Sequence, residues 1–401
     1  MTIGVSLRGL ACGIGNGRLD VSAEAGLSPN LFGRTNVVLV VSIWSSRMRK
    51  IILVALLIVL AGIYFQRATV IAVVMERGMD SRMDSNILDS LEDGLHVALC
   101  GAGGPMPAPN ASGPCVAVVA GDQLFIVDAG TDGVRNLGRM GYQVGDITAV
   151  FITHFHSDHI DTLGEMATIR WAAGSNPSPL PVYGPSGVET VVAGFNMAYS
   201  NDFVYRNEHH GDLVAPLKSA GLTAQPFPLP VDAQLTRVFE GNGLTVDALG
   251  VDHLPVDPAV GYLFTYEGRT ALITGDTDKS DVIEQHAKGV DLLVHEALAP
   301  NLVMMMNAAA ARNGNAVMEK ITFDILDYHA SPKEAAETAR AAGVGHLLYY
   351  HIVPPLMFPG QELLFLNGAE DIFPDYTVGR DGVSFSMPAN SDEIVKTKSG
   401  L

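Results

Sequence analysis

Cysteine is scarce in this sequence. The 401 residues include three cysteines, Cys12, Cys100 and Cys115, and none of them forms a Cys-x-x-Cys pair. Cysteine zinc fingers need such pairs, so any metal ion must be bound by other residues. Cys100 and Cys115 flank a short segment rich in Gly and Pro. They form a disulfide if this part of the chain is exported and stay buried thiols in a cytoplasmic protein, and the sequence leaves both alternatives open.

Positive charge is scarce as well. The chain has 25 Lys and Arg residues against 43 Asp and Glu, which gives a formal net charge of −18. Such a charge repels nucleic acid, whose binding normally depends on Lys and Arg contacts to phosphates. Polyanionic substrates are therefore disfavoured, and we do not expect nucleic acid as a partner.

The one dense basic block, Arg47–Lys50, precedes Ile51–Phe65, a run without any charge. The run is shorter than the roughly 20 residues of a membrane-spanning helix, but apolar character resumes at Ala68–Met75. We predict a signal peptide or membrane anchor at residues 48–75, and hence a periplasmic or membrane-anchored protein of a bacterial cell envelope. A buried helix in a cytoplasmic protein is the alternative. Residues 1–47 are predicted to be a poorly structured tail, which translation from Met48 would leave out.

After residue 94, short apolar runs alternate with turn residues and helical periods, which predicts an α/β fold with one catalytic domain at residues 95–390. Residues 76–94 are predicted to be a linker and residues 391–401 a tail. A hydrophobic share of 48% and a charged share of 17% support a buried core. Predicted strands are Leu95–Leu99, Val116–Val119, Leu124–Val127, Ala149–Thr153, Leu244–Val251, Val260–Tyr266, Ala271–Thr274 and Leu292–Val294. Predicted helices are Asp161–Ala172, Gly187–Ala198, Ser280–Ala287 and Ser331–Ala342, the last with a capping box at Ser331 and Glu334.

The segment Thr153–His159 carries three histidines and an aspartate within six positions. A His-x-His pair leaving a strand can present two imidazoles to one ion, while the Asp and His that follow can face a second. First-row metals favour such mixtures of imidazole nitrogen and carboxylate oxygen. We expect Asp158 and His159 to lie in a loop before the next helix.

The intact His-x-His-x-Asp-His pattern resembles the metallo-β-lactamase superfamily, and the resemblance continues in order from Leu95 to Pro354. It implies a four-layer αββα sandwich that binds two divalent ions, with zinc expected and manganese or iron as alternatives. It also implies that Asp128 orients the histidine loop, as carboxylates behind metal ligands do. The implied ligands are His154, His156 and His253 for the first ion, Asp158, His159 and His351 for the second, and Asp276 between the two.

Two further motifs, Leu293–Ala297 and Tyr328–Ser331, resemble motifs of the ribonuclease Z, phosphodiesterase and arylsulfatase branch. The resemblance makes His295 the candidate general acid and His329 a substrate or supporting contact, with buried structural histidines as the alternative. Between these motifs, the apolar segment Ala299–Tyr328 is either a lid over a leaving-group pocket or a helix packed on the core. Only 22 residues separate His253 from Asp276, too few for the long RNA-gripping arm of many ribonuclease Z proteins.

These features lead us to expect a hydrolase of small phosphodiesters or sulfate esters. A hydroxide held between the two metals would attack, with Asp158 orienting it and His295 protonating the leaving oxygen. The alternatives are a ribonuclease Z-like enzyme that processes tRNA 3′ ends, a lactone or thioester hydrolase, and a non-catalytic metal-binding protein. The resemblance also leaves a homodimer open.

Overall fold

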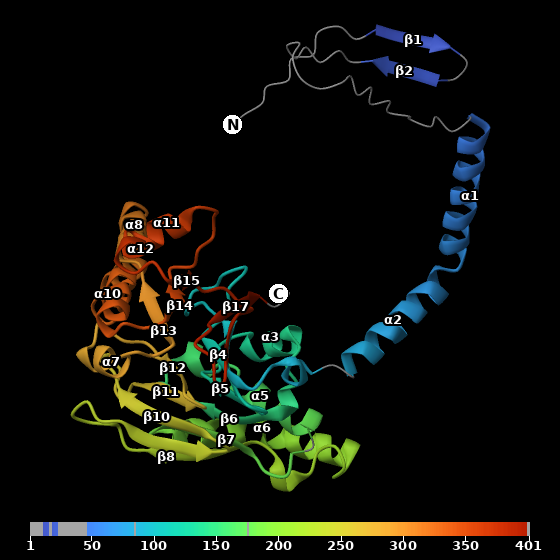
Figure 1. Cartoon of the computed structure of the whole chain (residues 1–401). Coiled ribbons are helices and arrows are strands. Elements are labelled where there is room, and N and C mark those ends of the chain that lie inside the picture. The colour runs from blue at the N-terminus through green and yellow to red at the C-terminus, as the bar shows by residue number, and fades with distance from the viewer. Residues whose placement is uncertain (1–10, 16–17, 23–45, 84–85, 175, 399–401) are drawn as a thin grey trace. The chain divides into compact units, whose positions relative to one another are not determined.

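The computed structural model describes residues 11–15, 18–22, 46–83, 86–174 and 176–398, and the chain divides into two units, Met1–Asp84 and Ser85–Leu401. The first unit has a two-stranded antiparallel sheet and two helices (Figure 1). These elements are β1 (Ala11–Gly15), β2 (Arg18–Ser22), α1 (Ser46–Phe65) and α2 (Arg67–Met83). The predicted tail at residues 1–47 lies largely outside the described residues.

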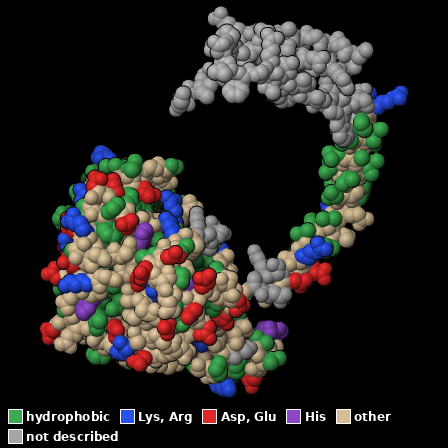
Figure 2. All heavy atoms as spheres, viewed as in Figure 1, with side chains coloured by type: hydrophobic (Ala, Val, Ile, Leu, Met, Phe, Trp, Pro, Cys, Tyr) green, Lys and Arg blue, Asp and Glu red, His purple; other side chains and the backbone are tan. Residues whose placement is uncertain are grey.

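Helix α1 carries exposed apolar side chains along its length, among them Ile51, Ile58 and Phe65 (Figure 2). No single helix in the described part of the chain is long and apolar enough to span a membrane. Lys50–Phe65 and Arg67–Asp80 meet those criteria of length and composition only as a pair, with a bend of 74° between them. The signal or anchor function of residues 48–75, and with it the location in the cell envelope, stays a prediction. The predicted linker begins inside α2, which continues to Met83.

The second unit contains two large sheets. The first has eight strands, and its central strands β5 to β8 run parallel. In spatial order the strands are β17 (Val395–Lys398), β16 (Val383–Pro388), β3 (Gly94–Gly101), β4 (Cys115–Ala120), β5 (Gln123–Val127), β6 (Ile147–Phe151), β7 (Leu180–Pro185) and β8 (Leu222–Phe227).

The second sheet has seven strands, and β12 to β15 run parallel in it. Strand β10 points the same way as β12, because each is antiparallel to β11 between them. The strands are β15 (Tyr376–Val378), β14 (His346–Val353), β13 (Leu292–Leu298), β12 (Arg269–Ile273), β11 (Val260–Tyr266), β10 (Leu244–Gly250) and β9 (Thr236–Gly241).

The hydrophobic core lies in three layers. One cluster, with Leu95, Phe151 and Tyr350, comes from the facing sides of the two sheets. Helices cover both outer faces (Figure 1), so the unit is an αββα sandwich. The helices are α3 (Gly133–Met140), α4 (Ser157–Ile160), α5 (Leu163–Gly174), α6 (Val188–His210), α7 (Asp281–His286), α8 (Pro300–Arg312), α9 (Ala316–Asp324), α10 (Pro332–Ala342), α11 (Gln361–Leu366) and α12 (Ala369–Ile372).

All eight predicted strands and all four predicted helices are present, with bounds that differ by a few residues or, for α6, by a longer extension. Helix α10 begins with the predicted capping box, in which Ser331 Oγ accepts from the Glu334 amide and Glu334 accepts from the Ser331 amide. Residues 391–398 are not a tail. Val395–Lys398 pairs with β16, and the buried Arg269 donates to the carbonyl oxygens of Ser391 and Glu393.

A disulfide joins Cys100 on β3 to Cys115 on β4 and closes the loop between these strands. The same loop is held by the Asp381 carboxylate, which accepts from the amides of Ala102 at 3.0 Å and Ser112 at 2.9 Å. Of the two alternatives that the sequence left open for these cysteines, the structure therefore has the bonded pair.

Candidate metal centre

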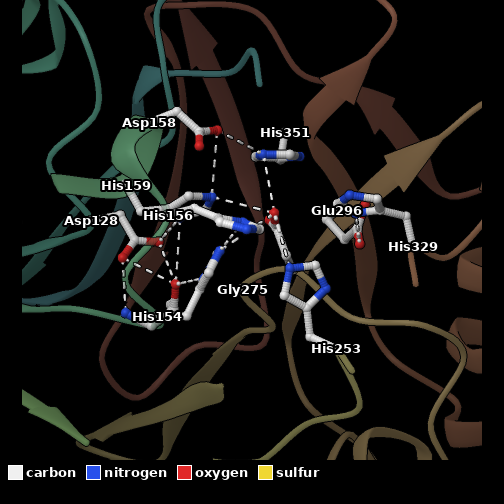
Figure 3. Close-up of polar contacts among 12 residues, drawn as sticks. Asp128, His154, His156, Asp158, His159, His253, Gly275, Glu296, His329 and His351 are labelled. Carbon is white, nitrogen blue, oxygen red and sulfur yellow. Dashed lines mark hydrogen bonds and ion pairs between the residues drawn. The ribbon is translucent and has the colours of Figure 1, made fainter. Parts of the chain in front are cut away.

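The candidate ligands leave the ends of strands that point to one edge of the sandwich, where loops of different sheets can meet. His154 and His156 follow β6, His253 follows β10, Asp276 follows β12 and His351 lies near the end of β14. Asp158 and His159 lie in the helical turn α4, not in the predicted loop, and both are buried. Figure 3 shows the side chains of the labelled ligand candidates pointing toward one another: His154, His156, Asp158, His159, His253 and His351.

Asp276 occupies the middle of this group. Its Oδ2 lies 3.3 Å from His351 Nε2, 3.4 Å from His159 Nε2, 3.8 Å from His154 Nε2 and 3.9 Å from His253 Nε2. The turn that places Asp276 depends on Gly275, whose φ is +66°. A Cβ atom added at Gly275 would lie 2.9 Å from both Thr153 Cβ and Val260 O. One carboxylate thus contacts histidines from both sheets.

Two of the imidazole rings, those of His159 and His253, are oriented by a hydrogen bond at Nδ1. The Asp128 carboxylate accepts from Thr153 N at 2.9 Å and from His159 Nδ1 at 2.8 Å. His253 Nδ1 donates to the Tyr328 carbonyl at 2.9 Å. Both contacts turn Nε2 of the imidazole toward Asp276, as supporting hydrogen bonds do in metal sites. This is the orienting role that the sequence predicts for Asp128.

Four buried polar atoms in the cluster have no hydrogen-bond partner among the described residues: His159 Nε2, His253 Nε2, Asp276 Oδ1 and His351 Nδ1. Such atoms are costly to bury unless something binds them. Burial also lowers the pKa of His253 to about 4, which keeps its ring neutral and able to bind a cation. The donors fit divalent ions that favour nitrogen and oxygen. Two of the donor groups that could hold an ion are His154, His156, His253, Asp276 and Asp158, His159, His351, and a third, overlapping group is Asp276, His329, His351.

His351 has a backbone φ of +44°, in the left-handed region that non-glycine residues seldom adopt. The conformation turns its ring between the two carboxylates, with Nε2 3.3 Å from Asp158 Oδ2 and 3.3 Å from Asp276 Oδ2. Backbone strain of this kind concentrates at functional sites.

The two motif histidines lie in different surroundings. His329 Nδ1 donates to Glu296 Oε1 at 2.8 Å (Figure 3). His329 also borders a cavity beside the ligands. Burial raises the pKa of Glu296 and lowers that of His329, but the attraction of Glu296 outweighs burial at the imidazole and raises the pKa of His329 to about 9. The ion pair with Glu296 thus favours the protonated form of the His329 imidazole.

His295 does not reach that cavity. Side chains alternate along β13, so His295 faces the helical layer with Leu293 and Ala297, whereas Glu296 follows Leu292 and Val294 toward the other sheet. His295 Nδ1 donates to the Glu296 carbonyl at 2.8 Å, and burial lowers the pKa of His295 to about 4. The geometry does not support His295 as the general acid. The alternation from Val294 onward is the signal that could have identified Glu296.

The cavity has a volume of about 130 Å³ and is bordered by His156, Asp158, Asp276, His329 and His351 on its polar side. Helices α8 and α9, which we call the α8–α9 hairpin, form much of the other side together with the loop closed by the disulfide. Of the two alternatives for Ala299–Tyr328, the structure therefore favours the lid.

Comparison with known proteins adds three findings. The family model of the beta-lactamase superfamily domain matches residues 124–352. The ribonuclease Z of Mycobacterium bovis (strain BCG / Pasteur 1173P2) is 35% identical over 272 residues, which cover 67% of this chain and 89% of the relative. Among solved structures, the metallo-beta-lactamase fold protein YhfI of Bacillus subtilis has a TM-score of 0.53 at 20% identity, covering 74% of this chain and all of that one. The short form of human tRNase Z has a TM-score of 0.50 at 21% identity, covering 73% and 99%.

Proposed function

Because the chain belongs to the metallo-β-lactamase superfamily, we propose that it is a metal-dependent endonuclease that cleaves phosphodiester bonds of RNA. The observation that carries the proposal is the likeness to a ribonuclease Z over 89% of that protein's length, together with a cluster of His and Asp donors able to bind divalent ions. Among the activities weighed from the sequence, the relatives favour RNA processing over hydrolysis of small esters.

The prediction that nucleic acid is not a partner is wrong, because the relatives are by name ribonucleases. The net charge of −18 is a sum over the chain and does not describe the field at the site. Two divalent ions would be the largest charges there, and they would attract a phosphate. The interval between His253 and Asp276 holds the β11–β12 hairpin and no arm, so recognition of RNA must use other surfaces.

Divalent ions held by the two donor sets would polarise the phosphate and lower the pKa of a bound water. The residues of the chain supply the remaining steps. Asp158 lies at the polar side of the cavity, where its carboxylate can orient the attacking water. His329 faces the same space, and Glu296 holds its Nδ1 proton, which leaves Nε2 to donate a proton to the leaving oxygen. The general acid that we propose is thus His329 and not His295.

The test uses the full chain loaded with zinc or manganese and an RNA precursor that carries a 3′ extension. We expect endonucleolytic cleavage that His154→Ala abolishes. His209→Ala is the matched control, because His209 is an exposed histidine at the end of α6, away from the ligands. Hydrolysis of bis(4-nitrophenyl) phosphate without cleavage of any RNA would overturn the RNA proposal and leave a hydrolase of small diesters.

A further inference from the structure

The cavity beside the metal ligands has one wall that the proposed chemistry does not use. This wall is apolar and is built by the α8–α9 hairpin with the residues that follow it and by the loop between Cys100 and Cys115. Its main side chains are Met106, Val303, Met306, Met318, Ile321 and Ile325. A phosphate and its metals need no such surface, so the wall is available to another part of the substrate.

The apolar wall offers few groups for hydrogen bonding. The Thr322 hydroxyl donates to the Met318 carbonyl at 2.6 Å and accepts from Asn307 Nδ2 at 3.0 Å, so it is occupied within the hairpin. Tyr328 is the other uncharged polar side chain at the cavity, and its ring lies 4.6 Å from that of His329. A group bound here is recognised by flat shape and apolar contact, and it is not read through its polar edges.

The position of His329 indicates which part of the substrate lies in the cavity. The leaving oxygen must lie next to the residue that protonates it, and His329 borders the cavity. In the reaction, the bond from the water oxygen to phosphorus forms while the bond from phosphorus to the leaving ribose oxygen breaks. The proton of His329 goes to that oxygen, and one proton of the water goes to solvent. The nucleoside that carries the leaving oxygen therefore lies against the apolar wall.

We infer that this cavity is the subsite for the nucleobase on the leaving side of the scissile phosphate. The inference rests on the proposed function and deepens it. Methionine sulfur and aromatic rings make favourable contacts with flat π systems, and every base offers such a face. The subsite thus requires a base without selecting its identity. The hairpin can adapt to purines and pyrimidines, because only Leu302, Val303 and Thr322 are buried on its two helices.

The experiment compares two RNA oligomers that differ only at the leaving-side nucleotide, one with a base and one with an abasic ribose. With the metal-loaded full chain, we expect kcat/KM to be about tenfold higher for the oligomer with the base. Met306→Ala should lower kcat/KM about tenfold for that oligomer and leave the abasic one unchanged. Met305→Ala is the matched control, since Met305 is the preceding residue of α8, is 56% exposed and lies outside the cavity.

Ile321→Ala, at a partly exposed position of the same wall, gives a second variant if Met306→Ala lowers the thermal unfolding midpoint. Equal cleavage of the two oligomers by the unmodified chain would overturn the subsite while the RNA proposal stands. An equal loss on both oligomers in Met306→Ala and Ile321→Ala would also overturn it. If neither oligomer is cleaved and the small diester is hydrolysed, the proposed function fails, and the nucleobase subsite fails with it.

Discussion

The two sheets contribute to the candidate metal centre in different ways. The eight-stranded sheet supplies His154, His156, Asp158 and His159 from one segment after β6, and these residues are neighbours in any conformation of the chain. The seven-stranded sheet supplies His253, Asp276 and His351 from three separate strand ends, which only the folded sheet brings together. The first group of ligands is local in the sequence, whereas the second is assembled from distant segments. The arrangement of the second group therefore depends on the fold far more than that of the first.

Removal of Asp276, the carboxylate that contacts both groups of ligands, tests this difference most directly. We expect Asp276→Asn to lower the rate of RNA cleavage by at least about a thousandfold, the upper range for losing one group that stabilises a transition state. Metal analysis should show fewer bound ions than in the unmodified chain. Asp278→Ala is the matched control in the same loop, where Asp278 contacts the Lys279 amide. Full metal content and activity in Asp276→Asn would contradict the role of Asp276 as a ligand between the two groups.

The next largest effect concerns the protonated histidine of the assembled group. His329→Ala should lower the rate about a hundredfold on substrates with a poor leaving group, because protonation of the leaving oxygen is lost. On a nitrophenyl ester, whose leaving group needs no proton, the loss should be small. Rates measured across a series of leaving groups check this. A loss of equal size throughout the series would remove His329 from the role of general acid.

Removal of the ions with a chelator tests the same difference through the stability of the folded protein. Ions that bind donors from both sheets should stabilise the folded state by about 3 kcal/mol when their free concentration is a hundredfold above the dissociation constant. Thermal unfolding of the unmodified chain with and without a chelator measures the difference. In Asp276→Asn the difference should shrink, since the local ligands alone hold the ion to one sheet. An unchanged melting temperature on chelation would show that the ions do not connect the sheets.

The next prediction concerns the stability that the disulfide gives to the loop between Cys100 and Cys115. Replacing Cys100 and Cys115 by Ser should destabilise the protein by about 3 kcal/mol, the value for a closed loop of some fifteen residues. Urea unfolding of the double variant, compared with the oxidised and the reduced parent chain, measures it. The reduced parent should match the variant, and equal stability in all three states would contradict a structural role of the bond.

The smallest effect on rate is expected at His295, the buried neighbour of Glu296. His295→Ala should leave cleavage within a few-fold of the unmodified rate and lower stability by about 1–3 kcal/mol, because it leaves a cavity and a carbonyl without its donor. Parallel rate and unfolding measurements separate the two effects. A loss of activity as large as that of His329→Ala, in a protein of unchanged stability, would restore His295 as the acid.

The sequence alone was enough to expect His154, His156, Asp158 and His159 close together, since the density of histidines after Ala149–Thr153 needs no knowledge of the fold. It also predicted strands that are buried and apolar, such as β3 and β11. Strand β7 was missed because Pro181 and Pro185 are poor strand residues. Strand β9 was missed because none of its side chains is buried, so it lacks an alternating apolar pattern. His295 and Glu296 could not be told apart without the face of β13, because adjacent residues of a strand point in opposite directions.

The pairing of β16 with β3 has a consequence for how the protein is made. Ser386 hydrogen-bonds to His96, 290 residues earlier, and His351 meets Asp158 across 193 residues. During translation the chain leaves the ribosome from its N-terminal end. The segment with His154 and His159 is therefore synthesised long before its partners from the other sheet. Strand β3 cannot pair with β16 until nearly the whole chain has emerged. Completion of the candidate metal centre is a late event in the synthesis of this protein.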